Sequence, residues 1–340
     1  MVIRTHMVAI FLAAAAGVGA AGCAGDGGAE DGKVHVVAGF YPLQFVAEQV
    51  GGDAVAVTNL AKPGAEPHDL ELSPRQMARI ADADLVFYLS GFQPAVDQSV
   101  AQQARQSSFD VASVEPLLDA AAEAGHEGGH MDDAHAGETG APGTGTAGPS
   151  GSAGPSGSAG AGATGGGARK DPHMWLDPVR LATIADRLAD RLSAVDPAHA
   201  AGYRERAGNL RARLEQLHRE YADGLRSCAR RELVVSHAAF GYLARRYRLE
   251  QIALSGISPE DEPPPQRLAE VAEQAREHQA TTIFFETLVS PKVAETIARE
   301  VGAATAVLDP VEGLPAGSTD DYFSVMRRNL ATLRPALGCP

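Results

Sequence analysis

Two histidines and one aspartate in this 340-residue chain lie after stretches that are expected to form strands. His68 lies in GAEPHDLEL after the apolar run that ends at Leu60, while His237 directly follows ELVVS and Asp309 directly follows ATAVL. His173 lies between two prolines in DPHMWLDP. Open parallel α/β sheets bind ligands beyond the carboxyl ends of their strands. Three imidazoles and one carboxylate gathered there predict a tetrahedral, zinc-type metal site.

Each of these residues also has an ordinary structural role. His237 could cap or pack against the helix that follows it, His68 could be a surface loop residue, and an aspartate before proline, such as Asp309, is typical of a turn. Their common placement at strand ends favours the metal site for the set as a whole. Glu66 and Glu286 are nearby carboxylates that could replace Asp309 or orient an imidazole by hydrogen bonding.

A second histidine cluster consists of His126, His130 and His135, which are interspersed with acidic residues. Tracts of this composition can recruit metal, and the alternative is a solvated acidic spacer. Residues 137–168 are rich in Gly, Ser, Pro and Ala without aliphatic periodicity, so they cannot offset the entropy of ordering and are predicted to be disordered. Together the two tracts form an insertion expected over residues 119–170.

The elements that must position the candidate ligands alternate between strand and helix. Apolar runs of strand length occupy residues 33–39, 54–60, 84–90, 232–236, 251–255, 281–286 and 304–308. Helical patterns lie between them, with helix-start signals in the Ser-Pro pairs at Ser73 and Ser290. This alternation predicts parallel sheets in both halves. A long amphipathic pattern from Pro197 to about Leu225 separates the halves and is long enough to span them.

The N-terminus has the pattern of an export signal, in which Arg4 and His6 precede an apolar run from Met7 to Gly19. Small residues then lead to Cys23, which resembles the acylated cysteine of a bacterial lipoprotein; the alternative is a plain secretory signal with an incidental cysteine. The formal charge of −14 argues against nonspecific nucleic-acid binding, which needs clustered Lys and Arg. We therefore expect an exported protein that a lipid anchors on the extracytoplasmic face, at the cell surface or in the periplasm.

Export also makes the two remaining cysteines, Cys228 and Cys339, candidates for a disulfide bond. Closing a loop of roughly 110 residues would stabilise the fold by about 4–5 kcal/mol in the chain-entropy account. The alternative is a pair of buried free thiols.

Four stretches together resemble the solute-binding lipoproteins of zinc and manganese ABC transporters (cluster A-I), and above all their zinc-uptake branch: GAEPHDLEL, DPHMWLDP, SHAAFGYLARRY and IFFETLVSPKVAETIAREVGAATAVLDP. The resemblance runs from about Val34 to the C-terminus, apart from the insertion. It implies an α/β fold with two lobes, each a parallel β-sheet flanked by helices, joined by one long rigid helix. The expected organisation is a signal peptide (1–22), a lipidated tether (23–33), an N-terminal lobe (34–195), a linking helix (196–227) and a C-terminal lobe (228–340).

The resemblance also implies roles for the candidate residues. The metal positions of the family fall on His68, His173, His237 and Asp309, in the cleft between the lobes. A histidine at the third position goes with zinc rather than manganese in that family. The implied function is high-affinity capture of Zn²⁺, with Mn²⁺ as the alternative ion, and delivery to an ABC-transporter permease by a monomer.

Other functions compete with this interpretation. An adhesin or a metal-storage protein would use the surface anchor without a permease. A secreted zinc hydrolase would also use three histidines, with an open position for water. The sequence offers no HExxH helix, however, and a fourth protein ligand would leave no water to activate. We therefore expect a binding protein without enzymatic activity.

Overall fold

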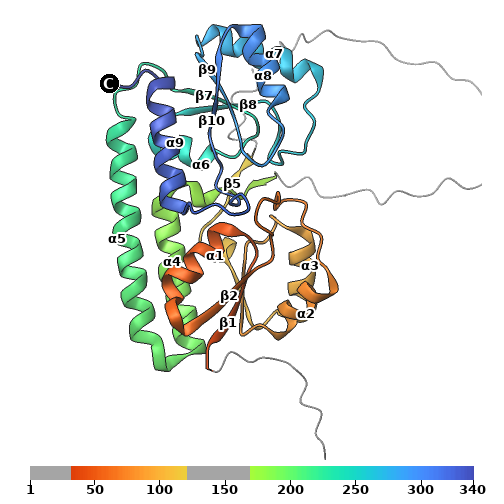
Figure 1. Ribbon diagram of the computed structural model, residues 1–340, viewed down its shortest axis with the longest axis vertical. Coiled ribbons are helices and arrows are strands. Elements are labelled where there is room, and N and C mark those ends of the chain that lie inside the picture. The colour runs from red at the N-terminus through yellow and green to blue at the C-terminus, as the bar shows by residue number, and fades with distance from the viewer. Residues whose placement is uncertain (1–31, 121–168) are drawn as a thin grey trace, which may run out of the picture. The chain divides into compact units, whose positions relative to one another are not determined.

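The computed structural model describes residues 32–120 and 169–340. The expected signal peptide and tether up to residue 31, Cys23, the cluster of His126, His130 and His135, and the tract 137–168 all lie outside the described residues. From Lys33 to Pro340 the chain forms one unit that contains two parallel sheets. Figure 1 shows these sheets in two lobes beside a pair of long helices.

The N-terminal lobe is built on a four-stranded sheet in the order β2-β1-β3-β4, with every pair of neighbours parallel. Its strands are β1 (Val34–Ala38), β2 (Val55–Asn59), β3 (Leu85–Tyr88) and β4 (Ser108–Asp110). Its helices are α1 (Tyr41–Gly51), α2 (Pro74–Asp82) and α3 (Pro94–Gln103). The Ser-Pro signal at Ser73 is confirmed, because Ser73 and Gln76 form a capping box that starts α2.

The C-terminal lobe repeats this arrangement, with a sheet in the order β10-β9-β7-β8 that is again entirely parallel. Its strands are β7 (Glu232–Val235), β8 (Glu250–Ala253), β9 (Thr282–Phe285) and β10 (Ala304–Val307). Its helices are α6 (Gly241–Tyr247), α7 (Pro265–Glu277), α8 (Lys292–Val301) and α9 (Tyr322–Ala336). The predicted fold of two α/β lobes is therefore confirmed.

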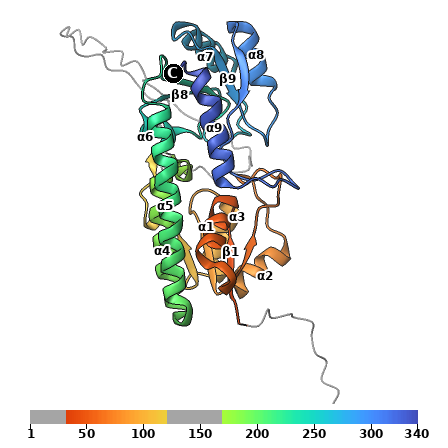
Figure 2. The same ribbon diagram turned by 60° about the vertical axis from the view of Figure 1, so that its left-hand side comes forward.

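The long helix α5 (Ala200–Gly224) lies along both lobes, and α4 (Pro178–Val195) lies beside it along the N-terminal lobe, as Figures 1 and 2 show. At one end of α5 the Arg206 guanidinium donates to the carbonyls of Val50 and Gly51 in the N-terminal lobe. Near its other end the Tyr221 hydroxyl donates to the Met326 carbonyl of α9, at 2.6 Å. The helix begins after a short 3-10 turn at 197–199, so it is slightly shorter than the expected range 196–227. It bridges the lobes.

The chain around the insertion is more ordered than expected at both of its ends. Leu118–Asp119 (β5) pairs antiparallel with Lys170–Asp171 (β6), so the two flanks of residues 121–168 lie side by side. The Tyr242 hydroxyl of α6 donates to the Asp171 carbonyl and accepts from the Leu118 amide. This ribbon holds the start of DPHMWLDP against the C-terminal lobe.

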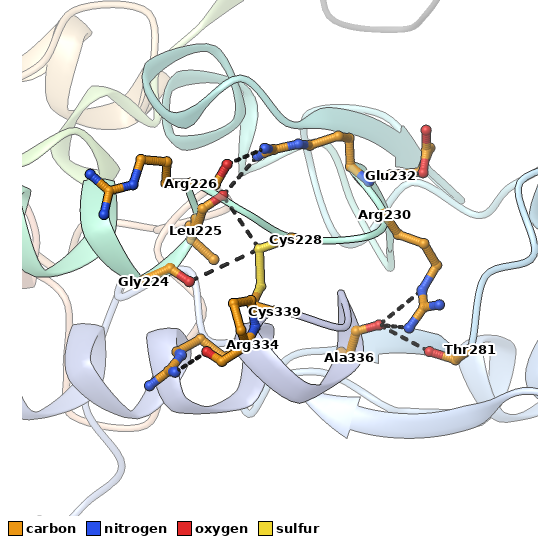
Figure 3. The surroundings of a disulfide bond; sticks show 12 residues. Gly224, Leu225, Arg226, Cys228, Arg230, Glu232, Thr281, Arg334, Ala336 and Cys339 are labelled. Carbon is orange, nitrogen blue, oxygen red and sulfur yellow. Dashed lines mark hydrogen bonds between the residues drawn. A yellow bond between two sulfur atoms is a disulfide. The ribbon is translucent and has the colours of Figure 1, made fainter.

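A disulfide bond joins Cys228, just after α5, to Cys339, just after α9. Figure 3 shows the same two segments held by hydrogen bonds around it. The Arg230 guanidinium donates to the Ala336 carbonyl, which also accepts from the Thr281 hydroxyl. The expected pairing is therefore present, and it ties the linking helix to the last helix. Within residues 32–120 and 169–340, no helix combines the length and apolar character needed to cross a membrane.

Candidate metal centre

The structure brings four buried side chains together, with donor atoms that all lie within 4.8 Å of one another: His68, His173, His237 and Glu312. His68 lies in the loop after β2, and His173 follows β6. His237 follows β7, and Glu312 lies in the loop after β10. The group thus draws on both lobes, with three members beyond the carboxyl ends of parallel strands. The expected gathering of the three histidines is observed.

The three imidazoles point one nitrogen each at the same carboxylate oxygen. The Nε2 atoms of His68, His173 and His237 lie 3.4, 3.1 and 3.3 Å from Glu312 Oε1. His237 Nε2 and Glu312 Oε2 form no hydrogen bond with any described residue, although both are buried. Buried polar atoms are rarely left unsatisfied in proteins, so these two atoms fit a site that is completed by a bound cation.

Two of the imidazoles are oriented by carboxylates on their other nitrogen. His173 Nδ1 lies 2.7 Å from Asp171 Oδ1, and His237 Nδ1 lies 2.7 Å from Glu286 Oε1. A carboxylate at Nδ1 fixes the ring and leaves the Nε2 lone pair free for a metal ion. Glu286 thus makes the imidazole contact that the sequence allows for it. Asp171 is not among the residues predicted from the sequence. Its position two residues before His173 is the feature that could have indicated it.

His68 is held differently, by its backbone and by ring packing. Both Glu66 carboxylate oxygens accept from the His68 amide at 3.0 Å, and Glu66 Oε1 lies 4.0 Å from His68 Nε2. The Phe92 ring packs edge-on against the imidazole, with centroids 4.5 Å apart. Burial raises the pKa of Glu66 to about 7 despite the backbone hydrogen bonds. Glu66 therefore supports the loop of His68 and is not one of the four gathered donors.

The fourth donor differs from the aspartate that was expected. Asp309 Oδ1 accepts from the Val311 amide at 2.8 Å, and its Oδ2 accepts from the Thr287 hydroxyl at 2.9 Å. Its carboxylate is therefore used inside the turn after β10, where Val311 adopts a left-handed φ of 58°. Glu312 directly follows Val311, and its carboxylate lies among the three histidines. The assignment of Asp309 is corrected to Glu312, which the sequence places only three residues later.

The turn is also anchored across the lobes by the DPHMWLDP stretch. The Trp175 indole donates to the Pro310 carbonyl at 2.8 Å, and the Tyr322 hydroxyl of α9 donates to the Trp175 carbonyl at 2.7 Å. The Asn329 side chain accepts from the Asp309 amide and donates to the Asp309 carbonyl. One stretch of sequence thus supplies His173 and also fixes the backbone that presents Glu312.

The charged groups of the site shift one another's pKa values through direct contacts. Burial raises the pKa of Glu312, but its contacts with three imidazoles outweigh burial and hold that pKa well below the usual range. Burial lowers the pKa of His237, but Glu286 and Glu312 outweigh it and raise that pKa to about 10. The pKa of His68, which has no carboxylate at Nδ1, is lowered, chiefly by burial. A metal ion must displace protons from imidazoles to bind, so binding is expected to release protons.

The orienting role of Asp171 predicts a measurable loss of affinity. Asp171→Asn removes the charge that faces His173 Nδ1, and loss of such a partner typically costs about 10–100-fold in metal affinity. Asp186→Asn, at a half-exposed carboxylate of α4 that pairs with Arg211, is the matched control and should leave affinity unchanged. Chelator competition would measure both. Equal affinities of the two variants would contradict the orienting role.

Comparison with known proteins identifies the chain's relatives. Residues 36–336 match the family model described as "Zinc-uptake complex component A periplasmic". The zinc-binding protein AdcA of Streptococcus pyogenes serotype M6 is 32% identical over 307 residues, which are 89% of this chain and 56% of AdcA. The high-affinity zinc uptake system protein ZnuA of Bacillus subtilis is 31% identical over 315 residues, which cover 90% of this chain and 88% of ZnuA.

The fold is also found among solved structures. Laminin binding protein Lmb of Streptococcus agalactiae, described as bifunctional with adhesin and metal transporting activity, superposes with a TM-score of 0.70 at 29% identity. The match covers 89% of this chain and 99% of Lmb. By contrast, this chain spans little more than half the length of the AdcA relatives.

Proposed function

This chain belongs to the zinc-uptake complex component A family, and we propose that it captures Zn²⁺ in the cleft between its lobes and delivers the ion to an ABC-transporter permease. The observation that carries the proposal is the convergence of three Nε2 atoms and one carboxylate at a buried point. Three nitrogen donors and one oxygen donor are typical of four-coordinate Zn²⁺. Mg²⁺ and Ca²⁺ instead prefer sites made of oxygen donors alone. The descriptions of AdcA as a zinc-binding protein and of ZnuA as a zinc uptake protein support the same ion.

The proposed role is carriage of the ion and not catalysis. A component of an uptake complex releases its substrate unchanged, and in this chain the fourth donor closes the tetrahedron that a hydrolytic water would otherwise enter. A monomer held on the extracytoplasmic face through lipidated Cys23 completes the proposal. Manganese is the second candidate ion, because a carboxylate is among the donors. Adhesion, which is one of the two activities described for Lmb, would be an additional role of the surface and is compatible with metal carriage.

The metal content of the protein tests the choice of ion. The protein purified from a medium with equal zinc and manganese should contain zinc, because imidazole donors prefer it. His237→Glu should lower the zinc content and raise the share of manganese. His35→Glu, at an exposed strand residue outside the site, is the matched control and should behave as the unmodified protein. Manganese in the unmodified protein would reject the zinc assignment.

Delivery needs its own measurement in cells. Deleting the gene should slow growth only when zinc is limiting, and the unmodified gene should restore growth where a His173→Ala gene does not. If the His173→Ala gene restored growth, the role of the protein in cells would not depend on the metal site.

A further inference from the structure

A hollow with a volume of about 230 Å³ lies where α5 and α6 end. Its lining residues are His218, Ala222, Leu225, Arg226, Arg231, Arg246, Tyr247 and Arg248. We call this hollow the arginine pocket. Four of these residues carry a guanidinium, and none of the described lining residues is acidic. Such a concentration of positive charge is unusual in a chain whose formal charge is −14.

Two of the arginines are fixed by the fold. Arg231 donates to the carbonyls of Leu225 and Arg226, at 2.8 and 2.7 Å, and so holds the loop that follows α5. The nearby Cys228 disulfide ties the same loop to α9 (Figure 3). Arg246 pairs with Asp177 Oδ2 at 2.6 Å, outside the lining. The backbone of the pocket is thus held in place before any ligand binds.

The other two arginines are available to a ligand. Arg226 has only a long contact of 3.5 Å with Asp223, and both side chains are more than 70% exposed, so solvent screens this pair. The Arg248 guanidinium forms no hydrogen bond and no ion pair with any residue that the structure describes.

The backbone at Arg248 adds a further observation. Arg248 ends α6 in the left-handed region, with φ of 58° and ψ of 44°, a position that usually favours glycine. The Cβ of any residue other than glycine makes this conformation unfavourable, although a positive charge at the end of a helix is itself favourable. Here the conformation projects an unpaired guanidinium beside the other arginines of the pocket.

The floor of the pocket is apolar and aromatic. Leu225 and Tyr247 are buried, and the Tyr247 ring stacks on Tyr221 with centroids 5.1 Å apart. His218 Nδ1 lies 3.3 Å from the Tyr247 hydroxyl. A ligand that combines an anionic head with a small apolar part would match both the rim and the floor.

We propose that the arginine pocket binds a phosphate group, carried either by a free phosphate compound or by a membrane lipid headgroup. The planar guanidinium matches phosphate oxygens with two parallel hydrogen bonds, which a general surface charge does not provide. The pocket shares no residue with the four gathered metal donors and does not depend on the identity of the metal. It would give an acidic protein one defined point of contact with anions.

The substitution Arg248→Gly tests this proposal in the full chain. Glycine suits the left-handed conformation, so the melting temperature should stay the same or rise while the guanidinium is lost. We expect binding of inorganic phosphate, measured by calorimetry at low salt, to weaken about tenfold, which corresponds to about 1.4 kcal/mol. Arg204→Ala, at an exposed arginine near the other end of α5, removes the same charge and should not change binding.

A second arm identifies the source of the phosphate. Vesicles of phosphatidylglycerol and phosphatidylcholine are compared with vesicles of phosphatidylcholine alone, in a flotation assay with the protein lacking its lipid anchor. Binding of inorganic phosphate without vesicle binding identifies a soluble ligand, and vesicle binding that Arg248→Gly weakens identifies a lipid headgroup. The proposal is overturned if neither probe binds saturably, or if Arg204→Ala weakens binding as much as Arg248→Gly does.

Discussion

Zn²⁺ should bind the Glu312→Gln variant at least about a hundredfold more weakly than it binds the unmodified protein. Four-ligand zinc sites have apparent binding free energies of about 10–16 kcal/mol, so one ligand accounts for about 3 kcal/mol, or about a hundredfold in affinity. Glutamine keeps the shape of the side chain but removes the charge that faces three imidazole nitrogens. Competition with a chromophoric chelator at fixed pH and salt would measure the change.

The matched control for Glu312 is Asp309→Asn. Asparagine can still accept from the Val311 amide through its carbonyl oxygen, so the turn that presents Glu312 should persist. We expect a loss of less than about tenfold, because the side chain contacts no metal donor directly and acts only by positioning the backbone. A larger loss in Asp309→Asn than in Glu312→Gln would restore Asp309 as the fourth ligand.

This pair of residues also shows what the sequence could and could not predict. His68 and His237 were predictable because each follows an apolar run, and because parallel sheets collect such ends at one edge. His173 lies in the stretch DPHMWLDP and was predictable only as a partner of these two. The choice between Asp309 and Glu312 was not predictable in that way. It depends on a turn with a left-handed valine and on hydrogen bonds from Thr287, Trp175 and Asn329, which lie far apart in the sequence.

The main elements of the fold were predictable from the sequence, but the short ribbon was not. Strand and helix alternation identified both parallel sheets, because strands that are covered on both faces read as continuous apolar runs. The ribbon of β5 and β6 was not expected, since two-residue strands carry no periodicity of their own. Their pairing is set by contacts to Tyr242 of α6, which are tertiary. The orienting role of Asp171 follows from the same local geometry, as Asp171 is the last residue of that ribbon.

Removal of the disulfide bond should lower the free energy of unfolding by about 4–5 kcal/mol, because the bond closes a loop across 111 positions of the sequence. The double variant Cys228→Ser, Cys339→Ser avoids a single free thiol that could pair between molecules. Urea unfolding in the absence of metal, with the slope fitted separately for each protein, would measure the difference.

The same variant should leave the zinc affinity of the folded protein within about threefold of normal, which corresponds to less than about 1 kcal/mol of binding free energy. The disulfide fixes the end of α9. The two residues of α9 that hold the turn after β10, Tyr322 and Asn329, lie at the start and in the middle of the helix. The Tyr221 bond to Met326 keeps that part of α9 on the linking helix without the disulfide. Stability and metal binding should therefore separate in this variant. A fall in affinity as large as that of Glu312→Gln would instead show that the disulfide positions the site.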